Sequence, residues 1–190
     1  MKVIVACEYS GIVRDAFTKK GHIAVSCDLL PTESVGHHYQ GDVCDILKYE
    51  WDILIAHPPC TYLTVAANRS FLNNPDRWKK RLDAMLFVYS LLNANIEKIC
   101  IENPVGVIST HIRQPDQYIQ PYEFGHPESK KTGLWLKNLP KLKPTCVVDP
   151  EWIIRGDGKR YSPQHERTRC PKERSKTYPG IADAMAEQWG

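Results

Sequence analysis

Four short aliphatic runs recur along the first hundred or so residues, and each ends on residues that can carry chemistry. They are KVIVAC at 2–7, HIAVSCD at 22–28, DILIAH at 52–57 and KICIENP at 98–104. Near-continuous apolar runs of this length are typical of strands that are buried on both faces of a parallel sheet. This repetition restricts the fold more than any other feature of the chain.

Helical patterns lie between the runs. Apolar residues at 12, 13, 16 and 17 stand between Ser10-Gly11 and Gly21, which predicts a helix with a glycine stop. A second helix is predicted over 76–94 from the spacing of Trp78, Leu82, Met85, Leu86, Tyr89 and Leu92. Strands that alternate with helices predict an α/β fold with a mostly parallel, doubly wound sheet. We expect a single domain over 1–190, because a chain with 42% hydrophobic residues suffices for one core and is short for two.

The later part of the chain has a different character. After about residue 105, nine prolines between 115 and 179 predict loops with a few short strands, one of them around Thr145–Val148. Residues 1–127 carry a net charge of −2, whereas residues 128–177 carry +7. We therefore expect a basic, loop-rich substrate-binding region at about 105–177 that contacts a polyanion. A basic face that serves only solubility remains the alternative.

Cysteine usage and hydropathy indicate the compartment. The seven cysteines include no CxxC pair, which fits neither a disulfide framework nor a zinc ribbon, so we expect reduced thiols and no metal site. No run approaches the roughly 18 apolar residues of a membrane span. MKVIVACEYSG lacks the pattern of a signal peptide. A cytoplasmic protein without a membrane partner is the expectation.

Ligand sites of doubly wound sheets gather at the carboxyl ends of the strands. Asp28 ends the second run and Asp42 lies in a later acidic turn, where such carboxylates can bind ribose hydroxyls or simply form turns. The first turn, CEYSG at 7–11, lacks both GxGxxG and the phosphate-binding GxxxxGK[ST] pattern. This predicts a nucleoside ligand without a long phosphate chain, such as S-adenosylmethionine.

The third run ends in HPPC. Pro58 and Pro59 fix the backbone and so orient Cys60 at the rim of the predicted ligand site. This position favours a nucleophile over a buried structural cysteine. The fourth run delivers Glu102 and Asn103 to the same rim, so we expect a carboxyl and a thiol to face one substrate.

HPPC followed by ENP resembles the nucleophile and acid motifs of the DNA cytosine-5 methyltransferases, a family with a Rossmann-like S-adenosylmethionine-dependent methyltransferase fold. CEYSG, with Phe17 and Gly21, is similar to the family's first cofactor motif, and PQHERTR at 163–169 is similar to its arginine motif. PGIADAMA at 179–186 is placed like its last cofactor motif. The motifs span most of the chain in the family's order. About ten residues separate Arg169 from Pro179, so the chain resembles a compact, phage-like member without a full target-recognition domain.

The resemblance implies transfer of a methyl group from S-adenosylmethionine to carbon 5 of cytosine in DNA, leaving S-adenosylhomocysteine. Cys60 would add to carbon 6, and a protonated Glu102 would donate to N3. Arg167 or Arg169 would hold the base carbonyl and a phosphate. The base must be flipped out of a duplex or be single-stranded. The implied cofactor-binding residues are Cys7, Ser10, Gly11, Asp28, Leu29, Asp42, Val43 and Pro58.

Several positions depart from the family. His57 replaces a small or different residue before Pro-Pro-Cys, and it could contact substrate, lower the pKa of the thiol or only pack. Thr61 replaces the usual Gln. DNA binding is therefore assigned to the basic stretch 128–143, with low sequence specificity or an unknown specificity partner. The predicted substrate-binding residues are His57, Asn103, Lys130, Lys131 and, as a stacking residue with a core position as the alternative, Trp135.

Four alternatives remain open. An amino-methyltransferase acting on adenine N6 or cytosine N4 shares the fold, but it has an aromatic residue directly after Pro-Pro, and here Tyr62 comes two places late. A non-catalytic nucleic-acid-binding protein on the same fold would have no need for both Cys60 and Glu102. Finally, the substrate could be RNA or a free nucleotide, and the transferred group could be other than a simple methyl.

Overall fold

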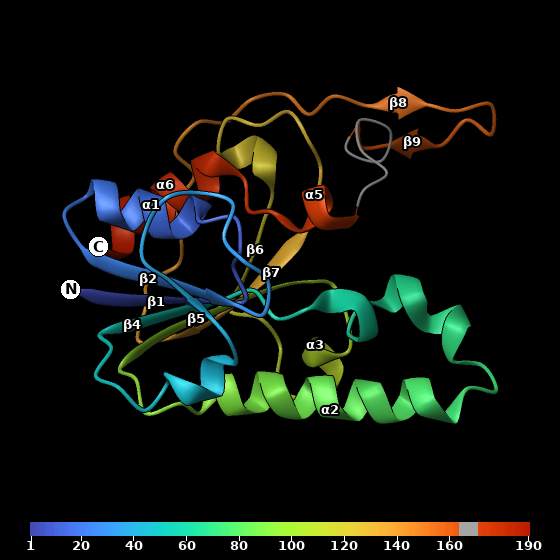
Figure 1. Cartoon of the computed structure of the whole chain (residues 1–190). Helices are drawn as coiled ribbons and strands as arrows, with labels where there is room; N and C mark the ends of the chain where they lie inside the picture. The colour runs from blue at the N-terminus through green and yellow to red at the C-terminus, as the bar shows by residue number, and fades with distance from the viewer. Residues whose placement is uncertain (164–170) are drawn as a thin grey trace.

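The computed structural model describes residues 1–163 and 171–190 (Figure 1). Its seven-stranded sheet has the order β3-β2-β1-β4-β5-β7-β6. Strands β1 to β5 pair in parallel, whereas β7 is antiparallel to both β5 and β6. The strands are β1 (Lys2–Ala6), β2 (Ile23–Asp28), β3 (His38–Gln40), β4 (Ile53–Ala56), β5 (Lys98–Pro104), β6 (Gln117–Ile119) and β7 (Thr132–Lys137). The predicted α/β fold with a mostly parallel sheet is confirmed.

Helices cover both faces of the sheet. Figure 1 shows α1 (Ile12–Lys19) and α6 (Pro179–Trp189) on one face, and α2 (Pro75–Leu92) and α3 (Ile108–His111) on the other. Successive residues of β1 point to opposite faces, so Val3 and Val5 pack toward α1 and α6 while Ile4 and Ala6 pack toward α2. Every residue of β4 is buried, because each face of this central strand meets a helical layer.

The remaining described elements are short. A two-stranded hairpin, β8 (Ile153–Ile154) with β9 (Arg160–Tyr161), extends away from the sheet in Figure 1, and α5 (Pro171–Ser175) follows later in the chain. Single turns of 3₁₀ helix occur at Val43–Asp45, Cys60–Tyr62 and Pro121–Glu123, and a longer one at Val65–Phe71. Across the described ranges, no helix combines the length and the apolar character that crossing a membrane would require.

The region after residue 105 contains more sheet than its prolines suggested. Both β6 and β7 belong to it, and together they complete the edge of the main sheet beyond β5. The prediction of a strand at Thr145–Val148 is wrong, because Cys146 makes only an isolated bridge to Phe124. Scattered prolines thus excluded long helices here but did not exclude short edge strands.

Trp135 corrects a prediction about substrate binding. Its side chain lies on β7 with 1% of its surface exposed, packed in the core cluster shared with α2. Its indole N–H donates to the Arg113 carbonyl at 2.7 Å. An indole that is buried and already hydrogen-bonded cannot stack on a nucleic-acid base, so Trp135 belongs to the core.

Helix α2 confirms the predicted element, but most of the apolar residues that predicted it are not buried. Asn74 caps its start by accepting from the Arg77 N–H at 3.2 Å, and Val88 and Leu91 are fully buried toward the sheet. Four of the residues that predicted the helix are instead more than half exposed: Trp78, Leu82, Leu86 and Tyr89. Apolar residues occupy more than one face of this helix, so their spacing identified a helix without identifying the side that is buried.

Replacing Trp135 should destabilise the protein. We expect Trp135→Ala to lower the free energy of unfolding by about 3–5 kcal/mol, because a large side chain is removed from a packed core. Trp135→Phe should cost less, since it loses mainly the hydrogen bond to Arg113, worth about 1 kcal/mol. Urea unfolding followed by circular dichroism measures both. Leu86→Ala, on the exposed side of α2, is the control and should stay within about 0.5 kcal/mol of the parent.

Candidate functional site

The strand register brings four chain segments to one rim. Ala6 of β1 pairs with Cys27 of β2 and with Ala56 of β4, and Ala56 in turn pairs with Ile101 of β5. The residues that follow these positions, among them Cys7, Asp28, His57 and Glu102, therefore lie along the carboxyl ends of adjacent strands. This is the part of an open α/β sheet where ligands bind.

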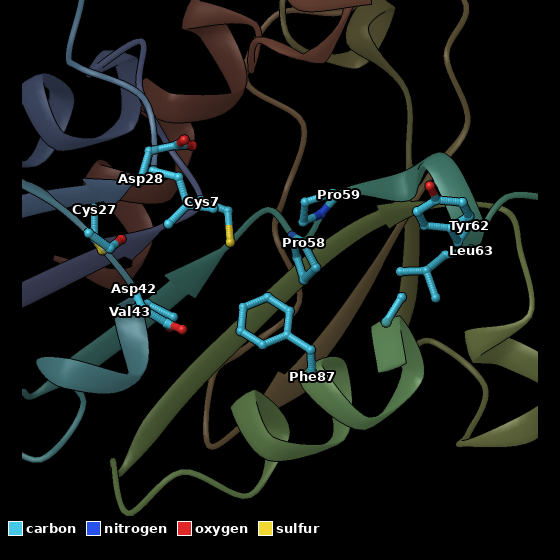
Figure 2. Close-up of a pocket in the computed structure, with 13 residues that line it drawn as sticks. Cys7, Cys27, Asp28, Asp42, Val43, Pro58, Pro59, Tyr62, Leu63 and Phe87 are labelled. Atoms are coloured by element: carbon cyan, nitrogen blue, oxygen red, sulfur yellow. The ribbon is translucent and has the colours of Figure 1, made fainter. Parts of the chain in front are cut away.

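A pocket of ≈ 370 Å³ opens at this rim (Figure 2). Six of its lining residues were predicted to bind a cofactor: Cys7, Asp28, Leu29, Asp42, Val43 and Pro58. Seven others were not anticipated: Cys27, Gly41, Pro59, Tyr62, Leu63, Ala84 and Phe87. Ala84 and Phe87 come from α2, which is far from the first turn in sequence. A helix that packs on the sheet thus forms one wall of the pocket.

The polar groups of the pocket are two carboxylates held in fixed positions. Asp28 accepts from the Leu30 N–H at 2.9 Å, and Asp42 accepts from the Cys44 N–H at 2.9 Å. An ionised carboxylate has about four acceptor sites, so each retains capacity for a ligand. Most of the other lining is apolar, including the ring of Phe87 opposite the Cys7 side chain in Figure 2. Size and lining suit a small, partly apolar molecule with hydroxyl or amino donors.

Neither cysteine of the pocket is an activated nucleophile. Burial, together with the charge of Asp28, raises the pKa of both Cys7 and Cys27, the latter to about 12. Both remain neutral thiols near pH 7 and present polarisable, uncharged surface to the pocket.

Two predicted cofactor residues lie outside the pocket lining. Gly11 precedes α1 with φ of 75°, and a Cβ there would collide with the side chains of Ser34 and Arg14. The Ser10 hydroxyl donates to the Glu8 carboxylate at 3.4 Å and is buried. Both residues shape the turn between β1 and α1, and neither contacts the pocket.

Arg14 fixes the chain segment that follows Asp28. Its guanidinium is fully buried on α1 and forms an ion pair with Asp15 at 2.7 Å. It also donates to the segment at 32–35 and to β2, through Ser26, Thr32, Ser34 and the Val35 carbonyl. A buried guanidinium needs all of these acceptors, so the segment is held close to α1.

Two hydrogen bonds tie the HPPC segment to the end of β5. His57 Nδ1 lies 2.7 Å from Glu102 Oε2, and Asn103 Nδ2 donates to the Pro58 carbonyl at 2.7 Å. Asn103 is 1% exposed, so this residue, predicted to contact substrate, instead supports Pro58. Cys60 begins the 3₁₀ turn Cys60–Tyr62 and is exposed, just beyond the two prolines that line the pocket.

The pKa shifts of the His57–Glu102 pair favour the proton on the imidazole. Burial alone would raise the pKa of Glu102, but the hydrogen bond and charge of His57, together with Lys130, lower it. Burial disfavours charge on His57 too, yet Glu102 and Glu8 outweigh this and raise its pKa. The expectation of a protonated Glu102 is therefore corrected for the protein without substrate. His57, predicted to contact substrate, has Glu102 as its partner.

Cys60 is not activated in this state. Partial desolvation by the surrounding protein raises the pKa of the thiol, although the positive charges of Lys130 and Arg174 act in the opposite direction. The alternative prediction that His57 makes Cys60 a low-pKa thiol is not supported, because the net shift is upward. Most of the Cys60 population near neutral pH is thiol.

Basic residues approach the thiol from the C-terminal half of the chain. Lys130 Nζ donates to the Arg174 carbonyl at 3.1 Å, which links the segment before β7 to α5. Arg174 was not anticipated from the sequence. Lys131 is exposed and lies 4.2 Å from the centre of the Tyr118 ring. Arg167 and Arg169, predicted to hold the base and a phosphate, lie outside the described residues. Within residues 1–163 and 171–190, no three side chains form a potential metal site.

Comparison with known proteins supports the fold. No family model and no curated protein sequence matches the chain. Among solved structures, the chain resembles a candidate DNA modification methyltransferase encoded within prophage Cp of E. coli, with a TM-score of 0.50 and 15% identity. The match covers 78% of this chain and 52% of that one, so the chain spans about half the length of the structure it resembles. The fold is thus a Rossmann-like methyltransferase fold.

A second solved structure is less similar. It is WbdD in complex with the kinase inhibitor LY294002, with a TM-score of 0.39 and 16% identity over 85% of this chain and 41% of that one. A TM-score this low informs neither fold nor function.

Alkylation should reveal the state of the thiols. Because the pKa of Cys60 is raised, its reaction with iodoacetamide should be slow near pH 7 and accelerate as the pH rises above the usual cysteine range. Lys130→Ala should slow it further by removing a positive charge that lowers this pKa. Peptide mass spectrometry after timed quenching measures the rate at each cysteine. Exposed Cys146 is the internal control, and fast labelling of Cys60 at pH 7 would contradict the assignment.

Proposed function

We propose that this protein transfers a methyl group from S-adenosylmethionine to carbon 5 of cytosine in DNA, through a covalent adduct with Cys60. The observation that carries the proposal is the pairing of two segments at the rim. HPPC and ENP are joined by two hydrogen bonds, so the thiol of Cys60 and the carboxyl of Glu102 belong to one rigid unit beside a pocket. A nucleophile and an acid that face one ring are the groups cytosine-5 chemistry requires.

The pocket fits the proposed methyl donor. Asp28 and Asp42 would accept hydrogen bonds from ribose hydroxyls and the adenine amino group, and Val43 and Phe87 would flank the apolar adenine. The bound donor would supply an electrophilic methyl group on a positively charged sulfur. Pro58 and Pro59 lie in the pocket lining, and Cys60 is the next residue. The donor and the nucleophile would therefore be neighbours, linked by the two prolines.

The chain's own groups account for the remaining steps. Carbon 5 of cytosine is a poor nucleophile, but addition of the Cys60 thiolate to carbon 6 turns the ring into an enamine-like species that can attack the methyl group. Glu102 lies where a carboxylic acid could donate to N3 and stabilise the charge that accumulates there. Loss of the carbon-5 proton to a base then restores the ring double bond and releases the Cys60 thiolate.

DNA would approach over the basic region. The charge of Lys130 contributes to the pKa shifts of His57, Cys60 and Glu102, so it would lie near the proposed reaction centre and suit the phosphate of an extruded nucleotide. Exposed Lys131 and Arg174 extend this charge outward, and Arg167 and Arg169 would add to it. The match leaves about half of the prophage-encoded neighbour uncovered, which agrees with low sequence specificity here or with a separate specificity partner.

One observation favours a second candidate, methylation of an amino nitrogen of adenine or cytosine. Tyr62 lines the pocket close after the two prolines, where an aromatic ring could stack on a flipped base. In that reaction Cys60 would form no adduct.

Incubation of the purified protein with unmethylated DNA and S-adenosylmethionine, followed by nucleoside mass spectrometry, distinguishes the two. We expect 5-methylcytosine; N6-methyladenine or N4-methylcytosine would replace the proposal with the second candidate.

Removing the proposed nucleophile should abolish the reaction without weakening the binding of the cofactor. In Cys60→Ala, methyl transfer to DNA should fall below detection, while the Kd for S-adenosylmethionine, measured by calorimetry, stays within about three-fold, because Cys60 acts on the base. Cys44→Ala, which removes another exposed cysteine, is the matched control and should retain transfer. Loss of cofactor binding in Cys60→Ala would instead indicate a structural thiol.

A substrate that cannot complete elimination should trap the enzyme. DNA that carries 5-fluorocytosine has no proton to lose at carbon 5, so methyl transfer should leave a stable Cys60–DNA adduct that shifts the protein on a denaturing gel. The adduct should require cofactor and be absent in Cys60→Ala. Normal turnover on ordinary DNA with no trapped species would exclude cytosine-5 chemistry.

A further inference from the structure

His57 is surrounded by charged groups from three neighbouring elements. Glu102 on β5 contacts Nδ1, Glu8 lies after β1, and Lys130 approaches from the segment before β7. Cys60 follows three residues later on the same segment. The imidazole side chain is about 10% exposed, and its backbone N–H donates to the Ala6 carbonyl at 3.0 Å, which fixes its position at the end of β4.

Glu8 cannot take over the role of Glu102. Its buried carboxylate accepts from the backbone N–H groups of Val13 and Arg14, at 2.7 and 3.2 Å, and so is committed to the start of α1. Burial raises its pKa even though His57 and these N–H groups lower it. The hydrogen bond along which a proton can pass to Glu102 is therefore the one from His57.

Simple packing does not account for a charged pair at this position. Burying two charges costs free energy that an apolar pair of similar volume would avoid. His57 Nε2 is also buried without a hydrogen-bond partner among the described residues, so the imidazole is not there to complete a local network. What the pair does provide is an imidazole nitrogen, Nδ1, that lies 2.7 Å from a carboxylate oxygen, a separation suited to proton transfer between them.

We propose that His57 is a positioning residue that supplies Glu102 with the proton it donates to the pyrimidine. This inference rests on the proposed cytosine-5 chemistry. When cytosine binds and the Cys60 thiolate adds to carbon 6, the proton on His57 Nδ1 moves to Glu102 Oε2 and a carboxyl proton moves to N3 of the ring. The imidazolium becomes neutral imidazole, and elimination of Cys60 returns the proton by the reverse route. No proton is gained from or lost to solvent in these two transfers.

This proton supply predicts a pH dependence with a definite sign. Below the raised pKa of His57 the imidazole carries a proton that it can pass to Glu102. As the pH rises through that pKa, His57 loses this proton and can no longer supply it. Cys60 requires the opposite change, because it must lose a proton. Without His57, Glu102 keeps a proton only at lower pH, where its own burial favours the neutral acid.

The test compares pH profiles of kcat for 5-methylcytosine formation in the parent and in His57→Gln, which keeps a polar side chain but carries no titratable proton. We expect His57→Gln to lose at least ~10-fold in kcat near pH 7, to lose clearly less near pH 5.5, and to keep its KM for S-adenosylmethionine. His57→Asn serves as a second variant should the first fold poorly. A loss that is the same at every pH, or no loss, would overturn the inference.

A second measurement does not depend on turnover. Nuclear magnetic resonance of ¹⁵N-histidine-labelled protein should show His57 as imidazolium at pH 7, with a pKa that falls in Glu102→Gln. A neutral His57 in the parent would overturn the inference whatever the activity. If the parent makes no 5-methylcytosine, the proposed function fails, whereas normal 5-methylcytosine formation with parallel pH profiles rejects only the role of His57.

Discussion

The backbone hydrogen bonds that pair β4 with β1 on one side and with β5 on the other bring the segments that follow these strands to one edge of the sheet. These three strands are buried between two helical layers, so none of them can slip in register without moving its apolar residues or exposing backbone groups. The ends of the strands are fixed as a consequence. Cys7, Asp28, HPPC and ENP meet at one rim although they are spread over a hundred residues of sequence.

Much of this arrangement could be predicted from local patterns. Aliphatic runs identified the strands β1, β2, β4 and β5, because a fully buried parallel strand requires an unbroken apolar stretch. Asp28 and the prolines before Cys60 could be placed in the site for the same reason, since they lie at the ends of predicted strands, and Asp42 could be placed there from its acidic turn. The walls contributed by Phe87 and Leu63 could not, because they depend on how α2 and the 3₁₀ turn pack against the sheet.

Other features depended on tertiary context. The basic stretch 128–143 suggested a surface, yet it contains β7, whose Trp135 is needed to cover the sheet beside β5. Proximity also decides the protonation of Glu102. Burial by itself favours the neutral acid, and the contact with His57, 45 residues away in sequence, reverses this with a further contribution from Lys130. No sequence pattern encodes such a contact, so the residue type could be assigned to the site while its charge state could not.

Pro58 and Pro59, which line the pocket and precede Cys60, limit how the chemistry could change in related chains. Proline holds φ near −65°, so rotation about the N–Cα bonds of these two residues cannot move Cys60 away from the pocket. Asn103 further anchors the segment through the Pro58 carbonyl. The spacing between pocket and thiol is thus set largely by covalent geometry. Phe87, in contrast, comes from α2, a separate element, so its side chain can change in size without a change in the HPPC segment. Adaptation to a donor with a larger transferable group would therefore use a smaller residue at position 87, with the two prolines and the proposed nucleophile left unchanged.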